Sequence, residues 1–176
     1  MTMPICWLNG AFGVGKSTTA KALEKQWPGS YRFDPEQIGF MLRKVIPRDC
    51  QTGDFQDLPL WREMTVATVT DLAQTCKRPI IIPMTIVVPQ YFDEVVGELR
   101  RNNLDLHHFT LVGSRTTLNK RIRRRWLLPE AKRWVRAQME RCVSALESPE
   151  FAVHIQTDNR NVKEIVKEIR SQLPDV

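Results

Sequence analysis

The 176-residue chain has the length of one domain with its own hydrophobic core, and 42% hydrophobic with 26% charged residues is a globular rather than a disordered composition. No basic segment precedes a long apolar run, so the sequence indicates neither a secretory signal nor a membrane-spanning helix, and we expect a cytoplasmic protein. Four cysteines, far apart and without a CxxC pair, favour reduced thiols over a disulfide framework or a metal site.

Short apolar runs alternate along the chain with longer segments of helical periodicity, which is the pattern of strands joined by crossover helices in a parallel sheet. The apolar runs predict strands at 5–8, 31–33, 80–82, 108–112 and 153–156. The periodic segments predict helices at 16–26, 35–45, 59–75, 89–102, 116–125, 129–146 and 162–173. Without repeats or linkers, the sequence predicts one doubly wound α/β domain over residues 1–176, built on a five-stranded parallel sheet.

The first predicted strand is followed by GAFGVGKS, which matches the P-loop (Walker A) pattern GxxxxGK[ST]. Glycines let backbone N–H groups point at a phosphate, and the following helix presents its positive N-terminus. Lys16 can then reach the β- and γ-phosphates, and Ser17 can ligate Mg²⁺. We therefore expect ATP and Mg²⁺ to be bound by Gly10, Ala11, Phe12, Gly13, Val14, Gly15, Lys16, Ser17 and Thr18.

Asp34 ends the second predicted strand and directly precedes a helix that begins with Pro35. A carboxylate at the carboxyl end of a parallel strand faces the ligand crevice, where it can accept the proton of a hydroxyl that attacks the γ-phosphate. Asp before Pro is also a common helix N-cap, and the two roles are compatible. Arg43, between two and three turns along the same helix, is a candidate substrate contact, with an ordinary surface arginine as the alternative.

The third predicted strand lacks the acidic residue with which many nucleotide hydrolases and kinases hold Mg²⁺ through water. Pro83, Met84 and Thr85 follow Ile82 instead. Either Asp34 takes the metal-linked role, or Thr85 and water do, or transfer is slow. A protein that binds nucleotide without transferring phosphate therefore stays open as an alternative.

Positive charge is concentrated in one segment, residues 115–141, which holds ten Lys or Arg and two Glu, while the whole chain has a net charge of +6. Such a segment can be a solvated helix face, a nucleic-acid surface with Trp126 and Trp134 interleaved, or a lid of arginines over a transferring phosphate. We favour the lid, because the P-loop supplies the anion that the arginines need, and we expect no nucleic-acid partner.

The lid prediction covers roughly residues 121–137. On a helix, Arg121 and Arg125 are four residues apart and share a face, as do Lys132 and Arg136 beyond the break at Pro129. Flexible arginines of this kind stabilise the transferring phosphoryl group and exclude water from it.

The loop after the fifth predicted strand carries Thr157, Asp158 and Asn159. In a doubly wound sheet this loop flanks the base of the nucleotide, so we predict Asp158 to contribute to nucleotide binding. A loop that only caps the last helix is the alternative. We expect the three histidines to be structural.

With the P-loop, the strand-end Asp and the arginine segment in this order, the chain resembles the small-molecule kinases of the P-loop superfamily. The closer resemblance is to the tunicamycin-resistance proteins, and a more distant one is to chloramphenicol phosphotransferase. The closer resemblance spans residues 7–159 and is carried by WLNGAFGVGKS, FDPEQIGFMLR, DFQDLPLWR, PMTIVVPQYFDEVVGELR, HHFTL and HIQTDN.

The resemblance implies an ATP-binding protein that protects a bacterium from tunicamycin, a lipid-tailed nucleoside antibiotic with sugar hydroxyls. It also implies that Arg121 matches the lid arginine that stacks on adenine, and that Arg125 matches the one that contacts phosphates. Such an amphiphilic substrate needs an apolar surface beside the phosphate site. The segment 46–64 offers Trp61 on an apolar stripe and Arg62 for an anionic or uracil-like group. Ordinary core packing of this stripe is the alternative. Peripheral contact with a membrane stays open.

The prediction for function is an ATP-dependent kinase that transfers the γ-phosphate to a hydroxyl of tunicamycin or a similar small molecule, with Lys16, Asp34 and Arg125 as catalytic residues. The alternative is a nucleotide-gated protein that sequesters the drug unmodified. A nucleic-acid-dependent NTPase is a third reading. The sequence predicts no oligomeric state.

Overall fold

The computed structural model describes residues 3–124 and 128–175. Its centre is a five-stranded, fully parallel sheet in the order β2-β3-β1-β4-β5. The strands are β1 (Ile5–Gly10), β2 (Tyr31–Arg32), β3 (Ile80–Pro83), β4 (Leu106–Val112) and β5 (His154–Gln156). The predicted doubly wound α/β fold is therefore confirmed, with strand ends that differ from the predicted ones by up to two residues.

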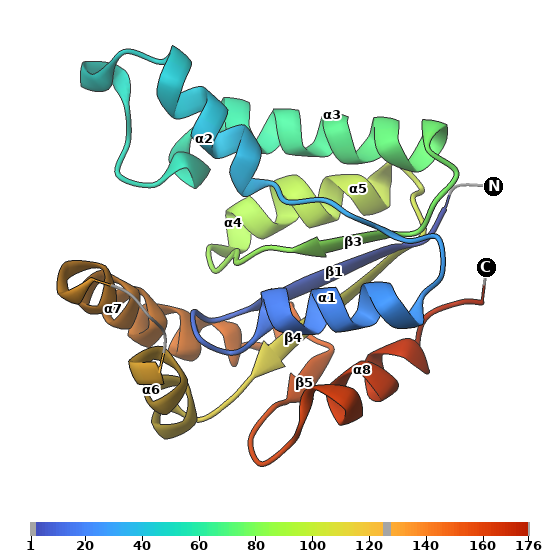
Figure 1. The fold of residues 1–176 in the computed structure, drawn as a ribbon. Coiled ribbons are helices and arrows are strands. Elements are labelled where there is room, and N and C mark those ends of the chain that lie inside the picture. The colour runs from blue at the N-terminus through green and yellow to red at the C-terminus, as the bar shows by residue number, and fades with distance from the viewer. Residues whose placement is uncertain (1–2, 125–127, 176) are drawn as a thin grey trace.

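The helices follow the predicted order. They are α1 (Lys16–Gln26), α2 (Glu36–Val45), α3 (Pro59–Thr75), α4 (Pro89–Phe92), α5 (Glu98–Arg101), α6 (Arg115–Arg124), α7 (Pro129–Leu146) and α8 (Val162–Arg170). Figure 1 shows α1 and α8 on one side of the sheet and α3, α4 and α5 on the other. The bounds of α1, α3 and α7 are the predicted ones.

Four helices differ from their predicted ranges, and α2 begins one residue later than predicted, at Glu36. The predicted helix 89–102 consists of α4, a π-helical turn at Asp93–Gly97 and α5. The predicted helix 162–173 ends at Arg170, where a turn begins. The helix predicted at 116–125 begins one residue earlier and is described as far as Arg124, since residue 125 lies outside the described residues.

The segment β1 is buried along its whole length because it lies between β3 and β4 under helices on both sides. Its apolar residues Ile5, Trp7 and Leu8 are fully buried. The strand continues past the predicted Leu8 to Gly10, since Asn9 and Gly10 pair with β4. This longer central strand positions the P-loop at the carboxyl edge of the sheet.

Local signals explain where several helices begin. Pro59 and Pro129 occupy the first positions of α3 and α7, where a missing N–H costs nothing. Asn161 and Glu164 form a reciprocal capping box at the start of α8. These local signals set the residue at which each of the three helices begins.

The strand order brings the P-loop and the other predicted site segments to the carboxyl edge of the sheet. From β1 the chain crosses to one side of the sheet for β2 and β3 and later to the other side for β4 and β5, so the carboxyl end of β1 is a topological switch point, where ligands bind in open α/β sheets. In Figure 1 the loop after β1, the start of α6 and α7, and the α2–α3 segment all lie toward this edge.

Two further expectations concern cysteines and membrane spans. Cys6 and Cys142 are buried, Cys50 and Cys76 are exposed, and all four are free thiols, as predicted. Within the described residues, no helix combines the length and the apolar character that crossing a bilayer requires.

Candidate functional site

The P-loop depends on glycine for its backbone shape and for its packing. Gly10 and Gly13 have φ angles of 146° and 86°, in the region that side chains disfavour. A Cβ on Gly13 would lie 2.8 Å from Cγ1 of Ile122, and one on Gly10 would lie 2.8 Å from the carbonyl oxygen of Leu111. The loop is thus fitted tightly against α6 and β4, which holds its backbone in place for a phosphate.

Lys16 lies folded across the P-loop. Its Nζ donates hydrogen bonds to the carbonyl oxygens of Gly10, at 2.7 Å, and Ala11, at 3.2 Å, and stands 5.6 Å from the centre of the Phe12 ring. Ser17 and Thr18 follow on the exposed first turn of α1. The arrangement places a cation, two hydroxyls and a helix N-terminus at one point, as phosphate binding requires.

A buried amide, Asn9, braces the P-loop against the segment that follows β3, and sequence reasoning missed it. Asn9 Oδ1 accepts from the backbone N–H of Gly10 at 2.8 Å and of Ile86 at 3.0 Å, while Nδ2 donates to Ile86 O at 2.8 Å. Thr85 Oγ1 donates to Gly10 O at 2.9 Å. An asparagine within an apolar strand is the signal that could have identified it, because a fully buried amide needs partners.

Asp34 lies half-buried just before α2, whose N-cap is Pro35. Its Oδ1 accepts a hydrogen bond from the backbone N–H of Glu36 at 3.0 Å. The predicted role as proton acceptor stays a prediction. This hydrogen bond holds the carboxylate just after β2, whose carboxyl end lies at the same edge of the parallel sheet as the carboxyl end of β1.

Glu36 is a second carboxylate near Lys16 that sequence reasoning did not single out. Burial raises the pKa of Glu36, the negative charges of Asp34 and Asp54 raise it further, and the positive charge of Lys16 opposes the rise. Asp54 belongs to the segment between α2 and α3, where its Oδ1 accepts from the backbone N–H of Gln56 at 3.0 Å. Only the fold brings Asp54 within electrostatic range of Glu36.

Arg121 joins the P-loop to the loop after β5. Its guanidinium donates to Val14 O at 2.8 Å, to Thr157 Oγ1 at 3.1 Å and to Thr157 O at 2.9 Å. The resemblance had implied a contact with adenine, and the structure places Arg121 beside both elements that would frame the nucleotide. Thr157, which is fully buried, is the partner that holds it there.

Asp158 anchors the start of α6 to the loop after β5. Burial raises the pKa of its carboxyl, but hydrogen bonds from Thr117 and from the backbone and side chain of Ser114 outweigh burial and hold the pKa below its ordinary value. The bond from Ser114 N to Oδ2 measures 2.8 Å. Asp158 and Ala11 also line a pocket of about 270 Å³ at the carboxyl ends of β4 and β5.

The described parts of the predicted lid segment belong to α6 and α7 and contact the P-loop. The Trp134 ring of α7 stands edge-on to the Phe12 ring, with centroids 5.5 Å apart and planes at 77°. Of the predicted lid residues, Arg136 is half-buried on α7, and Arg125 lies outside the described residues together with Trp126. Lid closure stays a prediction.

The predicted substrate residues Trp61 and Arg62 are both buried, which favours the alternative of ordinary core packing, and their contact with a substrate stays a prediction. Trp61 has no exposed surface and donates from Nε1 to Pro35 O at 3.0 Å, so it is core packing beneath α2. Arg62 is ion-paired with Glu94. Arg43 is exposed and donates to Gly53 O at 3.1 Å, and its predicted contact with substrate also stays a prediction.

Comparison with known proteins places these features in a family. The family described as AAA domain matches residues 5–149. The structure of the tunicamycin resistance protein of Deinococcus radiodurans is similar, with 30% sequence identity and a TM-score of 0.79, over 97% of this chain and 95% of that one. A search of curated proteins found no match.

More distant structures share the fold. The APS kinase of Mycobacterium tuberculosis in complex with AMPPNP and APS has a TM-score of 0.59 at 14% identity, over 97% of this chain and 96% of that one. The shikimate kinase of Bacteroides thetaiotaomicron has a TM-score of 0.58 at 17% identity, over 97% and 98%. The fold of this chain is therefore kinase-like and of the P-loop type.

Proposed function

Because the chain belongs to the tunicamycin-resistance proteins within the AAA domain family of P-loop kinases, we propose that it transfers the γ-phosphate of ATP to a hydroxyl of a nucleoside antibiotic such as tunicamycin. The observation that carries the proposal is the position of Asp34. The carboxylate accepts from the backbone N–H of Glu36 just after β2, at the carboxyl edge of the parallel sheet, where Lys16 also spans the phosphate loop.

The proposed reaction divides the site into two sides. On the nucleotide side, the P-loop N–H groups and Lys16 bind the phosphates, and Arg121 and Asp158 shape the space beside the base. On the acceptor side, Asp34 takes the proton from the attacking hydroxyl. The hydroxyl oxygen forms a bond to the γ-phosphorus, the bond from that phosphorus to the β,γ-bridging oxygen breaks, and ADP leaves.

Mg²⁺ fits the residues present. Ser17 offers an exposed hydroxyl on the first turn of α1, and Mg²⁺ in nucleotide sites takes few protein ligands and keeps several waters. The described residues contain no cluster of three or more His, Cys, Asp or Glu side chains that could hold a metal. We assign Ser17 as the protein ligand, and the bound ion would neutralise phosphate charge.

Mass spectrometry of tunicamycin after incubation with the protein and MgATP tests the proposal. A gain of one phosphate group is expected with the natural chain. Asp34→Asn should keep nucleotide binding and lose transfer, whereas Asp71→Asn, a change of an exposed residue on α3, should leave transfer intact. Transfer that survives in Asp34→Asn would remove Asp34 from the mechanism.

A second candidate function is sequestration of the drug without modification. It is supported by the end of β3, where Pro83 and the buried Met84 and Thr85 stand in place of a metal-linked carboxylate. In that case tunicamycin stays chemically unchanged, and its binding in equilibrium dialysis strengthens when AMPPNP and Mg²⁺ are added.

A further inference from the structure

The segment that follows β3 stays attached to β1 beyond the end of the strand. Just past β3, the backbone N–H of Met84 donates to Leu8 O at 3.1 Å. The next attachment uses a side chain, because the Asn9 amide accepts from the N–H of Ile86 at 3.0 Å and donates to Ile86 O at 2.8 Å. Asn9 is fully buried, so water does not compete for these bonds. The start of the P-loop therefore rests on the segment after β3.

Gly10, the first residue of the P-loop, is held through both its N–H and its carbonyl oxygen. The N–H donates to Asn9 Oδ1 at 2.8 Å. The carbonyl oxygen accepts from Thr85 Oγ1 at 2.9 Å and from Lys16 Nζ at 2.7 Å. Since a carbonyl oxygen has two lone pairs, these two donors satisfy it completely.

Nucleotide binding requires the Lys16 ammonium to move. A P-loop lysine reaches the β- and γ-phosphates, whereas Lys16 here donates to Gly10 O and Ala11 O. Ala11 O keeps a second donor when Lys16 leaves, because the N–H of Val14 also bonds to it, at 3.2 Å. Gly10 is buried, and the second donor to its carbonyl oxygen is the hydroxyl of Thr85. Without that hydroxyl, the departure of Lys16 would leave a buried carbonyl without a donor, which is costly.

We propose that Thr85 is a positioning residue for nucleotide binding, whose hydroxyl keeps the Gly10 carbonyl hydrogen-bonded when Lys16 leaves it for the phosphates. The inference rests on the nucleotide side of the proposed function. Thr85 acts on the nucleotide through Gly10 and Lys16, so its effect is confined to ligands that draw the lysine away from the loop.

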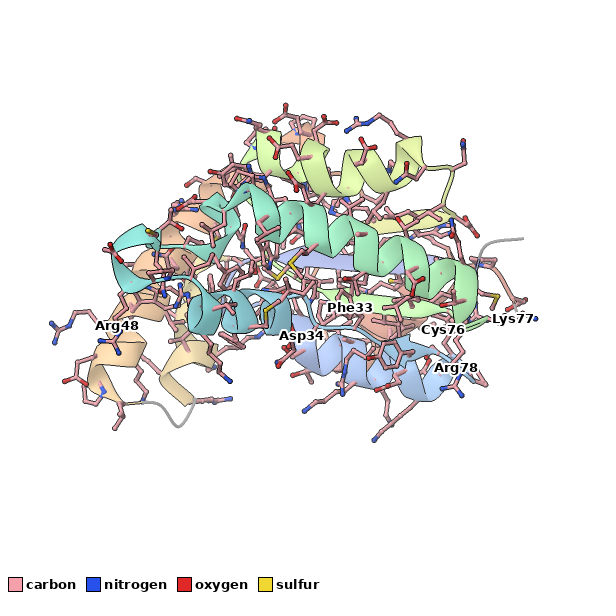
Figure 2. All side chains as sticks on the ribbon, turned by 90° about the horizontal axis from the view of Figure 1, so that it is seen from above. Phe33, Asp34, Arg48, Cys76, Lys77 and Arg78 are labelled. Carbon is pink, nitrogen blue, oxygen red and sulfur yellow. The ribbon has the colours of Figure 1, made fainter. Side chains whose placement is uncertain are left out.

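This role gives a use to the position at which a metal-linked carboxylate is missing. A carboxylate there could only accept hydrogen bonds, whereas the Thr85 hydroxyl donates to Gly10 O. The carboxylate of Asp34 belongs to another part of the site, where the chain enters α2 (Figure 2), and accepts from the N–H of Glu36. A hydroxyl that supports Gly10 acts with or without Mg²⁺, whereas a hydroxyl that holds the metal through water acts only when Mg²⁺ is present.

Isothermal titration calorimetry of AMPPNP with Thr85→Val tests the proposal, because valine has nearly the same shape as threonine and no hydroxyl. The affinity should fall about five- to thirtyfold, and by the same factor with Mg²⁺ and with EDTA. Thr85→Ser keeps the hydroxyl and should bind within about threefold of the natural chain. Thr65→Val is the matched control, because the fully buried Thr65 hydroxyl donates to Trp61 O at 2.8 Å within α3, and its loss should not change the affinity.

AMP separates positioning of Lys16 from general support of the loop. AMP has no β- or γ-phosphate, so Lys16 can stay on Gly10 O, and Thr85→Val should change the affinity for AMP less than about twofold. Ligand-detected NMR titration measures this affinity. Equal losses for AMP and AMPPNP would overturn the proposal, and so would an unchanged AMPPNP affinity in Thr85→Val or a loss that appears only with Mg²⁺. If Thr85→Val does not fold, Thr85→Ala takes its place with the same expected results.

These measurements keep the inference separate from the proposed function, because binding of AMPPNP and AMP needs no phosphate transfer. A chain that shows the selective loss in Thr85→Val but never phosphorylates tunicamycin fails only the transfer proposal. A chain that phosphorylates tunicamycin while Thr85→Val binds AMPPNP as the natural chain does fails only the positioning role of Thr85.

Discussion

Arg121 of α6 and Thr157 after β5 are joined by two hydrogen bonds, at 3.1 Å to the hydroxyl and 2.9 Å to the carbonyl oxygen, while the same guanidinium donates to Val14 O of the P-loop. One side chain therefore links three segments that are far apart in sequence. Hydrogen bonds to a charged group are worth about 1.5–3 kcal/mol, more than neutral ones. The nucleotide side of the site depends on this residue for its shape.

Replacing Arg121 by Ala should weaken binding of Mg·ATP by about tenfold to a hundredfold, because the P-loop and the β5 loop lose their common tie. Isothermal titration calorimetry measures this change. Arg124→Ala, an exposed residue of the same helix, serves as the control and should change the affinity less than threefold. Equal affinities in the two variants would contradict the assigned role.

Gly13→Ala should lower the free energy of unfolding by about 1–3 kcal/mol and impair nucleotide binding, because its Cβ meets Ile122 at 2.8 Å while the backbone stays at a positive φ. Gly29→Ala is the matched control. Gly29 also has a positive φ, of 77°, but no atom lies within 4 Å of its Cβ position. Urea denaturation of both variants separates the effect of the clash with Ile122 from the effect of backbone strain. Equal losses in the free energy of unfolding would contradict a contribution from the clash.

The stability of the fold should depend on pH through His108. Burial lowers the pKa of His108 to about 4, although its hydrogen bond to Ala152 O favours the protonated form. The unfolded chain, with a histidine pKa of about 6.5, then binds the proton more readily. The free energy of unfolding is therefore highest above pH 6.5 and falls, by on the order of 1–3 kcal/mol, as the pH decreases toward 4.

Denaturant unfolding at pH 7, 5.5 and 4.5 measures this dependence. His108→Gln should flatten the curve between pH 6.5 and 4. The neighbouring His107 pairs with Asp105 near the surface, at 2.9 Å, and His107→Gln should keep the slope of the natural chain. An unchanged slope in His108→Gln would assign the pH dependence to other groups.

Nucleotide binding should change the fluorescence of Trp134, because its ring is 56% exposed and packs against Phe12 of the P-loop. Edge-to-face pairs contribute about 0.5–1.5 kcal/mol, little enough for a ligand to rearrange. Addition of Mg·ATP should alter the tryptophan emission, and Trp134→Phe should remove more than half of that change. Trp27→Phe, a buried residue at the end of α1, should retain it. An undiminished change of tryptophan emission in Trp134→Phe would show that nucleotide binding at the P-loop does not alter the surroundings of Trp134 on α7.

Local patterns predicted most of the fold. The bounds of α1, α3 and α7 follow from the P-loop and from two prolines at helix starts, signals that act over a few residues. The predicted single helix at 89–102 missed the π-helical turn, because one turn of i→i+5 hydrogen bonds within a helix has no residue signature of its own. Strand ends shifted because pairing with neighbours, as at Asn9, decides where a strand stops.

The features of the candidate site also fall into those that one segment of sequence determines and those that packing between segments determines. The sequence by itself determined the P-loop, the place of Asp34 and the absence of a carboxylate after β3, since each is a matter of residue type and spacing within one segment. The tertiary structure alone decided that Trp61 and Arg62 are buried, that Arg121 meets Thr157, and that Asp54 approaches Glu36. Burial and charge proximity depend on distances between segments, and only the packed chain sets those distances.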